Sequence, residues 1–112
     1  MAKSADPGII KEIRRFASDP THVWPTRQAK SDMLAHGLTT EDVCDTIIDW
    51  IDARERVKLT TIHSVPGFVG MPAYEMKPRI NGVLFYIKVV LMELESENER
   101  MLLFSVHPDH SY

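Results

Sequence analysis

Residues 74–94 read YEMKPRINGVLFYIKVVLMEL and contain the clearest structural signal in the chain. The pair Asn81-Gly82 is typical of a two-residue hairpin turn, because both residue types accept the positive φ angles that such a turn requires. Apolar and polar side chains alternate around this pair, which indicates strands. The stretch therefore predicts an antiparallel hairpin, with one strand from Tyr74 to Ile80 and a longer one from Val83 to Leu94. Pro78 places the shorter strand at an edge of the sheet, since proline cannot donate a backbone hydrogen bond.

Further strands are expected on both sides of this hairpin. Val57 to His63 is predicted to be a strand, and residues 64–72, with two glycines and two prolines, are predicted to be a loop. A polar loop over Glu95–Glu99 leads into a last strand from Arg100 to His107. The second half of the chain is therefore expected to form a sheet of three to five antiparallel strands.

The first half of the chain has helical periodicity, with apolar residues three and four positions apart. Each expected helix begins at a residue type that caps a helix N-terminus, and the first two end at a proline or glycine signal. A loop containing Trp24-Pro25 separates the first two helices. The expected start and stop signals are, in chain order, Asp6-Pro7, Ser18-Asp19-Pro20, Thr26, Gly37, and Thr39 or Thr40. Helices followed by strands predict an α+β fold in which the helices pack on one face of the sheet.

Length and composition are those of one small globular domain covering residues 1–112. The chain is 44% hydrophobic and 26% charged, so it can bury a core without a disulfide or a structural metal ion. Its single cysteine, Cys44, excludes an intrachain disulfide and is expected to be a buried apolar side chain. No secretory signal, membrane span or cofactor motif is recognisable, so we expect a cytoplasmic protein with no cofactor, no metal ion and no membrane partner.

The alternation of side chains along the strands predicts which residues enter the core. In the long strand, Tyr86 and Lys88 point away from the core. In the last strand, Leu103, Ser105 and His107 are expected to point away, and Leu102, Phe104 and Val106 to point inward. In the shorter strand of the hairpin, Glu75, Lys77 and Arg79 share one face. The expected core comprises Ile13, Phe16, Ile47, Ile51, Phe85, Ile87, Val89 and Phe104.

The open face of the predicted sheet gathers side chains that suit a phosphodiester. The net charge of −3 argues against a simple nucleic-acid binder, but the segment from Lys77 to Lys88 has three cations and no acid. Lysine and arginine stabilise phosphate charge, histidine exchanges protons near neutral pH, and tyrosine positions a phosphate or stacks on a base. The candidate residues on this face are Lys77, Arg79, Tyr86, Lys88 and His107. An ordinary polar sheet face remains the alternative interpretation.

The order of short motifs along residues 9–107 resembles one known family. The motifs are Thr26-Arg27 with Ala29, Gly37-Leu38, Val43-Cys44, Ile47-Ile48, Lys58 with Thr60-Thr61, Pro78-Arg79, Tyr86-Ile87-Lys88, Leu103-Phe104-Ser105 and His107. Their order and spacing are similar to those of the motility quorum-sensing regulator (MqsR) family. The resemblance implies a RelE-like toxin fold, cleavage of mRNA without a metal ion, and a cognate antitoxin protein that neutralises the toxin.

The resemblance also implies individual site residues. Lys58 and Tyr86 match active residues of the family, whereas His107 replaces a family lysine and Ala73-Tyr74 stand where the family has a glutamine. We therefore expect an endoribonuclease toxin of a type II toxin–antitoxin pair, with Lys58, Tyr86, Lys88 and His107 catalytic and Lys77 and Arg79 binding the substrate. A catalytically silent module that keeps the toxin fold and engages a protein partner is the second hypothesis. A small domain of another role, sharing only the layout, is the third.

Overall fold

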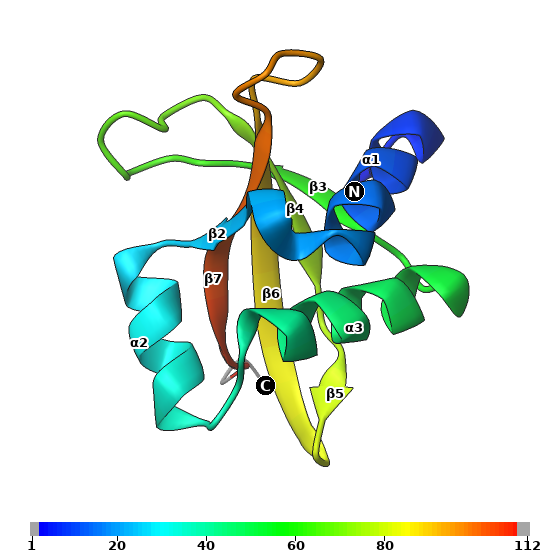
Figure 1. Ribbon diagram of the computed structural model, residues 1–112, viewed down its shortest axis with the longest axis vertical. Coiled ribbons are helices and arrows are strands. Elements are labelled where there is room, and N and C mark those ends of the chain that lie inside the picture. The colour runs from blue at the N-terminus through cyan, green and yellow to red at the C-terminus, as the bar shows by residue number, and fades with distance from the viewer. Residues whose placement is uncertain (1–2, 110–112) are drawn as a thin grey trace.

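The computed structural model describes residues 3–109, which form three α-helices and a seven-stranded mixed sheet (Figure 1). The strand order is β1-β3-β4-β6-β7-β2, and β5 pairs with β6. The elements are β1 (Lys3–Ser4), α1 (Pro7–Ser18), the 3₁₀ helix η1 (Pro20–His22), β2 (Val23–Pro25), α2 (Arg27–Ala35), α3 (Thr40–Asp52), β3 (Lys58–Thr61), β4 (Pro72–Met76), β5 (Arg79–Ile80), β6 (Val83–Met92) and β7 (Arg100–Pro108). The α+β class is confirmed. The expectation of three to five antiparallel strands is wrong, because the sheet is larger and β2 runs parallel to β7.

The three helices begin where their capping residues predict. The Asp6 carboxylate accepts a hydrogen bond from the Gly8 N–H at 2.8 Å, and the Thr26 hydroxyl accepts one from the Ala29 N–H at 3.2 Å. Thr39, not Thr40, caps α3, and it forms a reciprocal capping box with Asp42. None of the helices within residues 3–109 combines the length and the apolar character that crossing a bilayer requires.

The hairpin at Asn81-Gly82 has the expected turn, since both residues have positive φ angles (52° and 81°) and Ile80 pairs with Val83. The single strand expected from Tyr74 to Ile80 is instead two strands, β4 and β5, with Lys77-Pro78 between them. The edge position inferred from Pro78 is wrong for β4, which lies between β3 and β6. Pro78 has no backbone N–H, so no donor is left unsatisfied at this position. Its carbonyl accepts a hydrogen bond from the Phe85 N–H at 2.8 Å.

Two short edge strands were not predicted. The Trp24-Pro25 segment, expected to be a loop, belongs to β2, in which Val23 pairs with Met101 of β7. At the other edge of the sheet, β1 is antiparallel to β3, with Lys3 opposite Leu59. Each of these strands has only two or three residues, too few to show an alternation in the sequence.

A β-bulge in β7 changes which side chains enter the core. Val89 of β6 lies opposite Leu103, but Lys88 lies opposite Ser105, so Phe104 is an extra residue. Leu103 and Val106 are fully buried against the helices, whereas Leu102 and Phe104 join a second, smaller apolar cluster. The core positions expected for Leu102 and Phe104 are therefore wrong, and those expected for Val106 and for the inward residues of β6 are confirmed. The main core includes Ile13, Phe16, Ala29, Met33, Val43, Ile47, Phe85, Ile87, Val89, Met101, Leu103 and Val106, with Ile51 packed against it.

Thr26 at the start of α2 holds the bulge in place. Its backbone N–H donates to the Leu103 carbonyl at 3.1 Å, and its hydroxyl donates to the Phe104 carbonyl, also at 3.1 Å. The same hydroxyl caps α2 by accepting from Ala29. One side chain therefore satisfies both the helix terminus and a backbone carbonyl at the bulge, which the sheet ladder leaves without its usual partner.

Replacing Thr26 by alanine should lower the free energy of unfolding by roughly 1–2 kcal/mol, because both hydroxyl contacts are lost together. Urea denaturation followed by circular dichroism measures this loss. Thr26→Ser is the matched control, since it keeps the hydroxyl, and it should retain most of the wild-type stability. Equal losses in the two variants would contradict the role of the hydroxyl.

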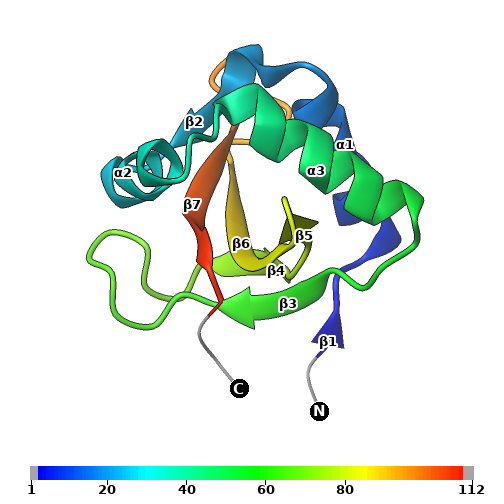
Figure 2. The same ribbon diagram turned by 90° about the horizontal axis from the view of Figure 1, so that it is seen from below.

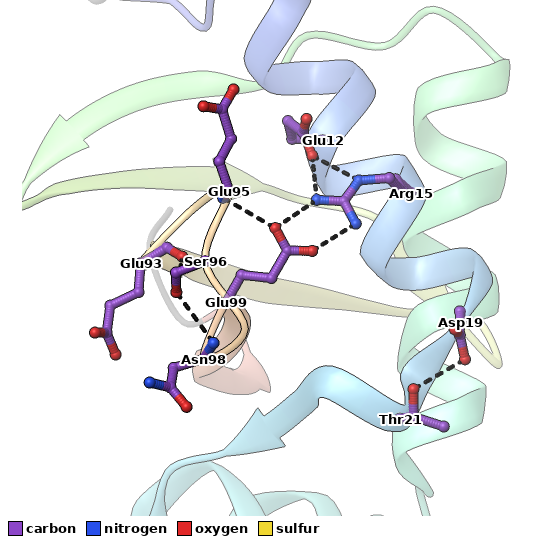
Figure 3. Close-up of polar contacts among 9 residues, drawn as sticks. All are labelled: Glu12, Arg15, Asp19, Thr21, Glu93, Glu95, Ser96, Asn98 and Glu99. Atoms are coloured by element: carbon purple, nitrogen blue, oxygen red, sulfur yellow. Dashed lines mark hydrogen bonds and ion pairs between the residues drawn. The ribbon is translucent and has the colours of Figure 1, made fainter.

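The loop between β6 and β7 is tied to α1 by Arg15 (Figure 3). The guanidinium donates to both carboxylate oxygens of Glu99, at 2.8 and 3.2 Å, and to Glu12 at 2.7 Å. Glu99 also accepts from the Glu95 N–H at 3.1 Å. The hydrogen bonds from Arg15, followed by the one from Glu95, lower the pKa of Glu99 below its usual value.

Because the carboxyl pKa is lower in the folded state, Glu99 stabilises the native state at pH values above its unfolded-state pKa. This contribution to the free energy of unfolding is lost as the pH falls through the folded-state pKa. Wild-type protein should therefore be more stable than Glu99→Gln near neutral pH, and the difference should shrink towards pH 3. Urea midpoints measured at both pH values test this. Glu97→Gln, which changes an exposed carboxyl of the same loop, should give a smaller difference at neutral pH. A Glu99→Gln difference that does not change with pH would count against the ion pair.

Candidate functional site

Four strands bring the predicted polar side chains together on the sheet face that points away from the main core. Lys58 of β3 lies opposite Glu75 of β4, Glu75 lies opposite Lys88 of β6, and Lys88 lies opposite Ser105 of β7. The neighbouring row pairs Tyr86 with His107. Figure 2 shows these strands in sequence, with β3 and β4 below β6 and with α1 and α3 above it and to its right. We call Lys58, Glu75, Tyr86, Lys88 and His107 the polar array.

Glu75 is the centre of the polar array. The Tyr86 hydroxyl donates a short hydrogen bond to Glu75 Oε2, and Lys58 Nζ lies 3.5 Å from Glu75 Oε1. The Glu75 side chain is only 12% exposed, so these two contacts form in a partly dry environment. Burial first, and then the hydrogen bond to Glu75, raise the pKa of Tyr86 well above its usual value. Tyr86 therefore stays a neutral hydrogen-bond donor at physiological pH.

The rings of His107 and Tyr86 are stacked, with centroids 5.4 Å apart and planes 20° apart. His107 Nδ1 lies 2.8 Å from the Pro108 carbonyl oxygen, which can only accept a hydrogen bond. Nδ1 must therefore carry a proton, and Nε2 is the basic nitrogen of the neutral ring. Lys88 Nζ lies 5.5 Å from the centre of the Tyr86 ring. Within residues 3–109 Lys88 makes no ion pair, so its charge is available to an anion.

The two residues expected to bind substrate lie in different places. Lys77 Nζ lies 3.3 Å from Asp109 Oδ2, and Asp109 is close enough to Tyr86 to contribute to its raised pKa. Lys77 therefore borders the polar array. Arg79 donates to the Gly82 carbonyl and lines a hollow of about 250 Å³ beside Trp50 of α3. The structure does not bring Arg79 to the polar array.

Glu75 was missed by the sequence analysis, although the alternation placed it on the same face as Lys77. The choice of candidates favoured cations, histidine and tyrosine, because they match the charge of a phosphate. The strand register gives the signal that was overlooked: it places a carboxylate directly opposite two lysines, Lys58 and Lys88, and Glu75 forms an ion pair with the first of them.

Other chemistries find less support among the residues described. Cys44 is buried in α3, and burial raises the pKa of its thiol to about 12, so it is not poised as a nucleophile. The described part of the chain contains no group of three or more histidine, cysteine, aspartate or glutamate side chains arranged to hold a metal ion. The polar array itself combines one exchangeable proton site, His107 Nε2, with two ammonium groups. This combination can bind an anion and move a proton beside it.

Comparison of the chain with protein-family models, with curated proteins and with solved structures gave no match.

Proposed function

We propose that this protein is an endoribonuclease toxin with a RelE-like fold, an mRNA interferase that acts without a metal ion and is neutralised by a cognate antitoxin protein. The proposal rests on one observation: Lys58, Glu75, Tyr86 and His107 form a chain of contacts, with Lys88 beside the Tyr86 ring. The resemblance of the sequence to the MqsR family favours the same activity. An mRNA substrate places this activity in the cytoplasm.

In the proposed reaction, the 2′-oxygen of a ribose forms a bond to the adjacent phosphorus, and the bond from phosphorus to the 5′-oxygen breaks. The bonding electron pair leaves with the 5′-oxygen, which takes a proton from water. His107 Nε2 accepts the proton of the 2′-hydroxyl and afterwards returns it to the hydroxide left by that water. Lys58 and Lys88 stabilise the charge that develops on the phosphoryl oxygens. The products carry a 2′,3′-cyclic phosphate and a 5′-hydroxyl.

The remaining residues of the array act on these groups. The Tyr86 hydroxyl is already donated to Glu75, so Tyr86 orients the phosphate through the side chains around its ring, His107 and Lys88. Glu75 is a positioning residue that holds Tyr86 and Lys58. Lys77, at the border of the array, binds a flanking phosphate. Arg79 has no part in this mechanism because it lies beside α3.

The direct test is incubation of the purified protein with a mixed-sequence RNA in the presence of EDTA. We expect fragments that end in 2′,3′-cyclic phosphate, and no cleavage of the same sequence made with 2′-deoxyribose. Expression in bacterial cells should arrest growth, and coexpression of the neighbouring antitoxin gene should relieve the arrest. Intact RNA together with normal growth would refute the proposal.

One observation favours the catalytically silent alternative. Ion pairs to Glu75 and Asp109 already neutralise Lys58 and Lys77, which weakens the attraction of this face for RNA. In that case the fold would only engage a protein partner. Binding of the antitoxin by a protein that neither cleaves RNA nor arrests growth would establish this second function.

A further inference from the structure

A hollow of about 440 Å³ lies beside the polar array, between the start of α2, the loop of residues 62–71 and the bulge of β7. Its volume is within the usual range for sites that bind small organic groups, about 300–1,000 Å³. The walls are apolar, formed by Val65, Phe68 and Phe104, and the polar residues Arg27, Gln28 and Ser105 also line it. In Figures 1 and 2 the loop and α2 both lie to the left of β7, with the loop above α2 in Figure 1 and below it in Figure 2.

The walls of this pocket are fixed by the fold. The bulge gives Phe104 its place in the second apolar cluster, which Phe68 joins from the loop. The two rings pack edge to face, with centroids 5.3 Å apart and planes 71° apart. The loop is closed at its base by hydrogen bonds from Ile62 N–H to the Met71 carbonyl and from Gly70 N–H to the Ile62 carbonyl, both 2.9 Å long. The pocket is therefore present before any ligand arrives.

Ser105 joins the pocket to the polar array. It lines the pocket and lies directly opposite Lys88, and His107 is two positions further along the same strand. A group whose phosphate rests on Lys88 and His107 thus has an aromatic pocket next to it on the same sheet face. Arg27, which makes no ion pair among the described residues, adds a positive charge to the lining of the pocket.

We propose that this pocket binds the base of a nucleotide that flanks the cleaved phosphate. The inference rests on the proposed ribonuclease function and adds to it a site that reads single-stranded RNA. A base presents flat faces that pack on aromatic rings, and polar edges that can meet Arg27, Gln28 and Ser105. An aliphatic ligand would use the walls but would gain nothing from the adjoining cations.

The test measures binding without cleavage. A fluorescently labelled 2′-O-methyl pentanucleotide and five versions with one abasic position each are titrated with the protein, and fluorescence anisotropy gives the Kd. Loss of the base that occupies the pocket should weaken binding by roughly 5- to 150-fold, the range for one stacked base. Phe68→Ala should bind the intact oligonucleotide as weakly as the wild-type protein binds the version that lacks the base in the pocket. The Kd of Phe68→Ala should be the same for the intact oligonucleotide and for that abasic version.

Matched variants keep the test decisive. Val69→Ala changes an exposed residue of the same loop that does not line the pocket, and it should bind like wild type. Phe68→Leu keeps an apolar side chain without a ring, so it should fold normally and still lose most of the preference for the base.

The possible failures are distinguishable. Equal Kd values for the intact oligonucleotide and all abasic versions would overturn the pocket proposal, even if the protein cleaves RNA. Base-dependent binding that Phe68→Leu leaves unchanged would also overturn the pocket proposal, because the base would then bind elsewhere on the protein. The pocket would in that case be left for another ligand, such as a peptide. Base-dependent binding that Phe68→Leu removes, in a protein without ribonuclease activity, would uphold the pocket and refute only the catalytic proposal.

Discussion

His107→Ala should cleave RNA about 100- to 10,000-fold more slowly than wild type, which is the usual contribution of a general base. The imidazole has Nδ1 bound to the Pro108 carbonyl and stacks on Tyr86, so Nε2 is the nitrogen that is free to accept the 2′-hydroxyl proton. Single-turnover cleavage of a labelled RNA measures the rate of the chemical step. His107→Gln, which keeps a polar side chain but cannot take up a proton, should be as slow as the alanine variant.

A second histidine provides the control for this prediction. His22→Ala removes an exposed imidazole from η1, and it should cleave RNA at the wild-type rate. Urea denaturation of each variant separates a loss of chemistry from a loss of fold. A His107 variant that keeps its fold and retains half or more of the wild-type rate would remove the imidazole from the mechanism.

Ile87→Ala should lower the free energy of unfolding by about 2–5 kcal/mol, the range for removing a large aliphatic side chain from a packed core. Ile87 is fully buried in the middle of β6, and the register places it between Met76 of β4 and Val106 of β7. The change leaves a cavity that the neighbouring strands cannot close without breaking their pairing. Urea denaturation monitored by fluorescence and by circular dichroism gives the loss.

Two comparisons make this prediction specific to the sheet faces. Val83→Ala, at a position 47% exposed on the same strand, should change the stability by less than about 0.5 kcal/mol. Phe104→Ala removes a larger side chain but should destabilise less than Ile87→Ala, because Phe104 lies at the bulge in the smaller cluster beside an open pocket. A greater loss from Phe104→Ala would mean that the faces of β7 are assigned incorrectly.

The elements that could be predicted from the sequence are those fixed by neighbouring residues. Asp6-Pro7 and Thr39 mark helix starts through hydrogen bonds that span two or three positions, and Asn81-Gly82 specifies a turn by its own backbone preferences. The inward face of β6 follows from the regular alternation of buried and partly buried residues from Leu84 to Val89. In each case the physical cause lies within the segment itself.

The features that could not be predicted depend on segments far apart in the sequence. The pairing of Val23 with Met101 leaves no trace in a three-residue strand, and the bulge at Phe104 depends on Thr26, 78 positions earlier. The predicted side-chain directions in β7 are correct after the bulge, for Ser105, Val106 and His107. They are wrong up to the bulge, for Leu102, Leu103 and Phe104. The role of Glu75 likewise needs the register of three strands.

The position of β7 also determines when the protein can fold during its synthesis. β7 lies between β6 and β2, and its backbone carbonyls bind Thr26 at the start of α2. A nascent chain in which Arg100–Pro108 still occupies the ribosomal tunnel has made all three helices but lacks the strand against which α2 and β2 are held. Contacts of such long sequence separation form late, since the intervening loop must first be closed. His107 belongs to this same strand. The polar array is therefore completed only at the end of folding, after Arg100–Pro108 has left the ribosomal tunnel.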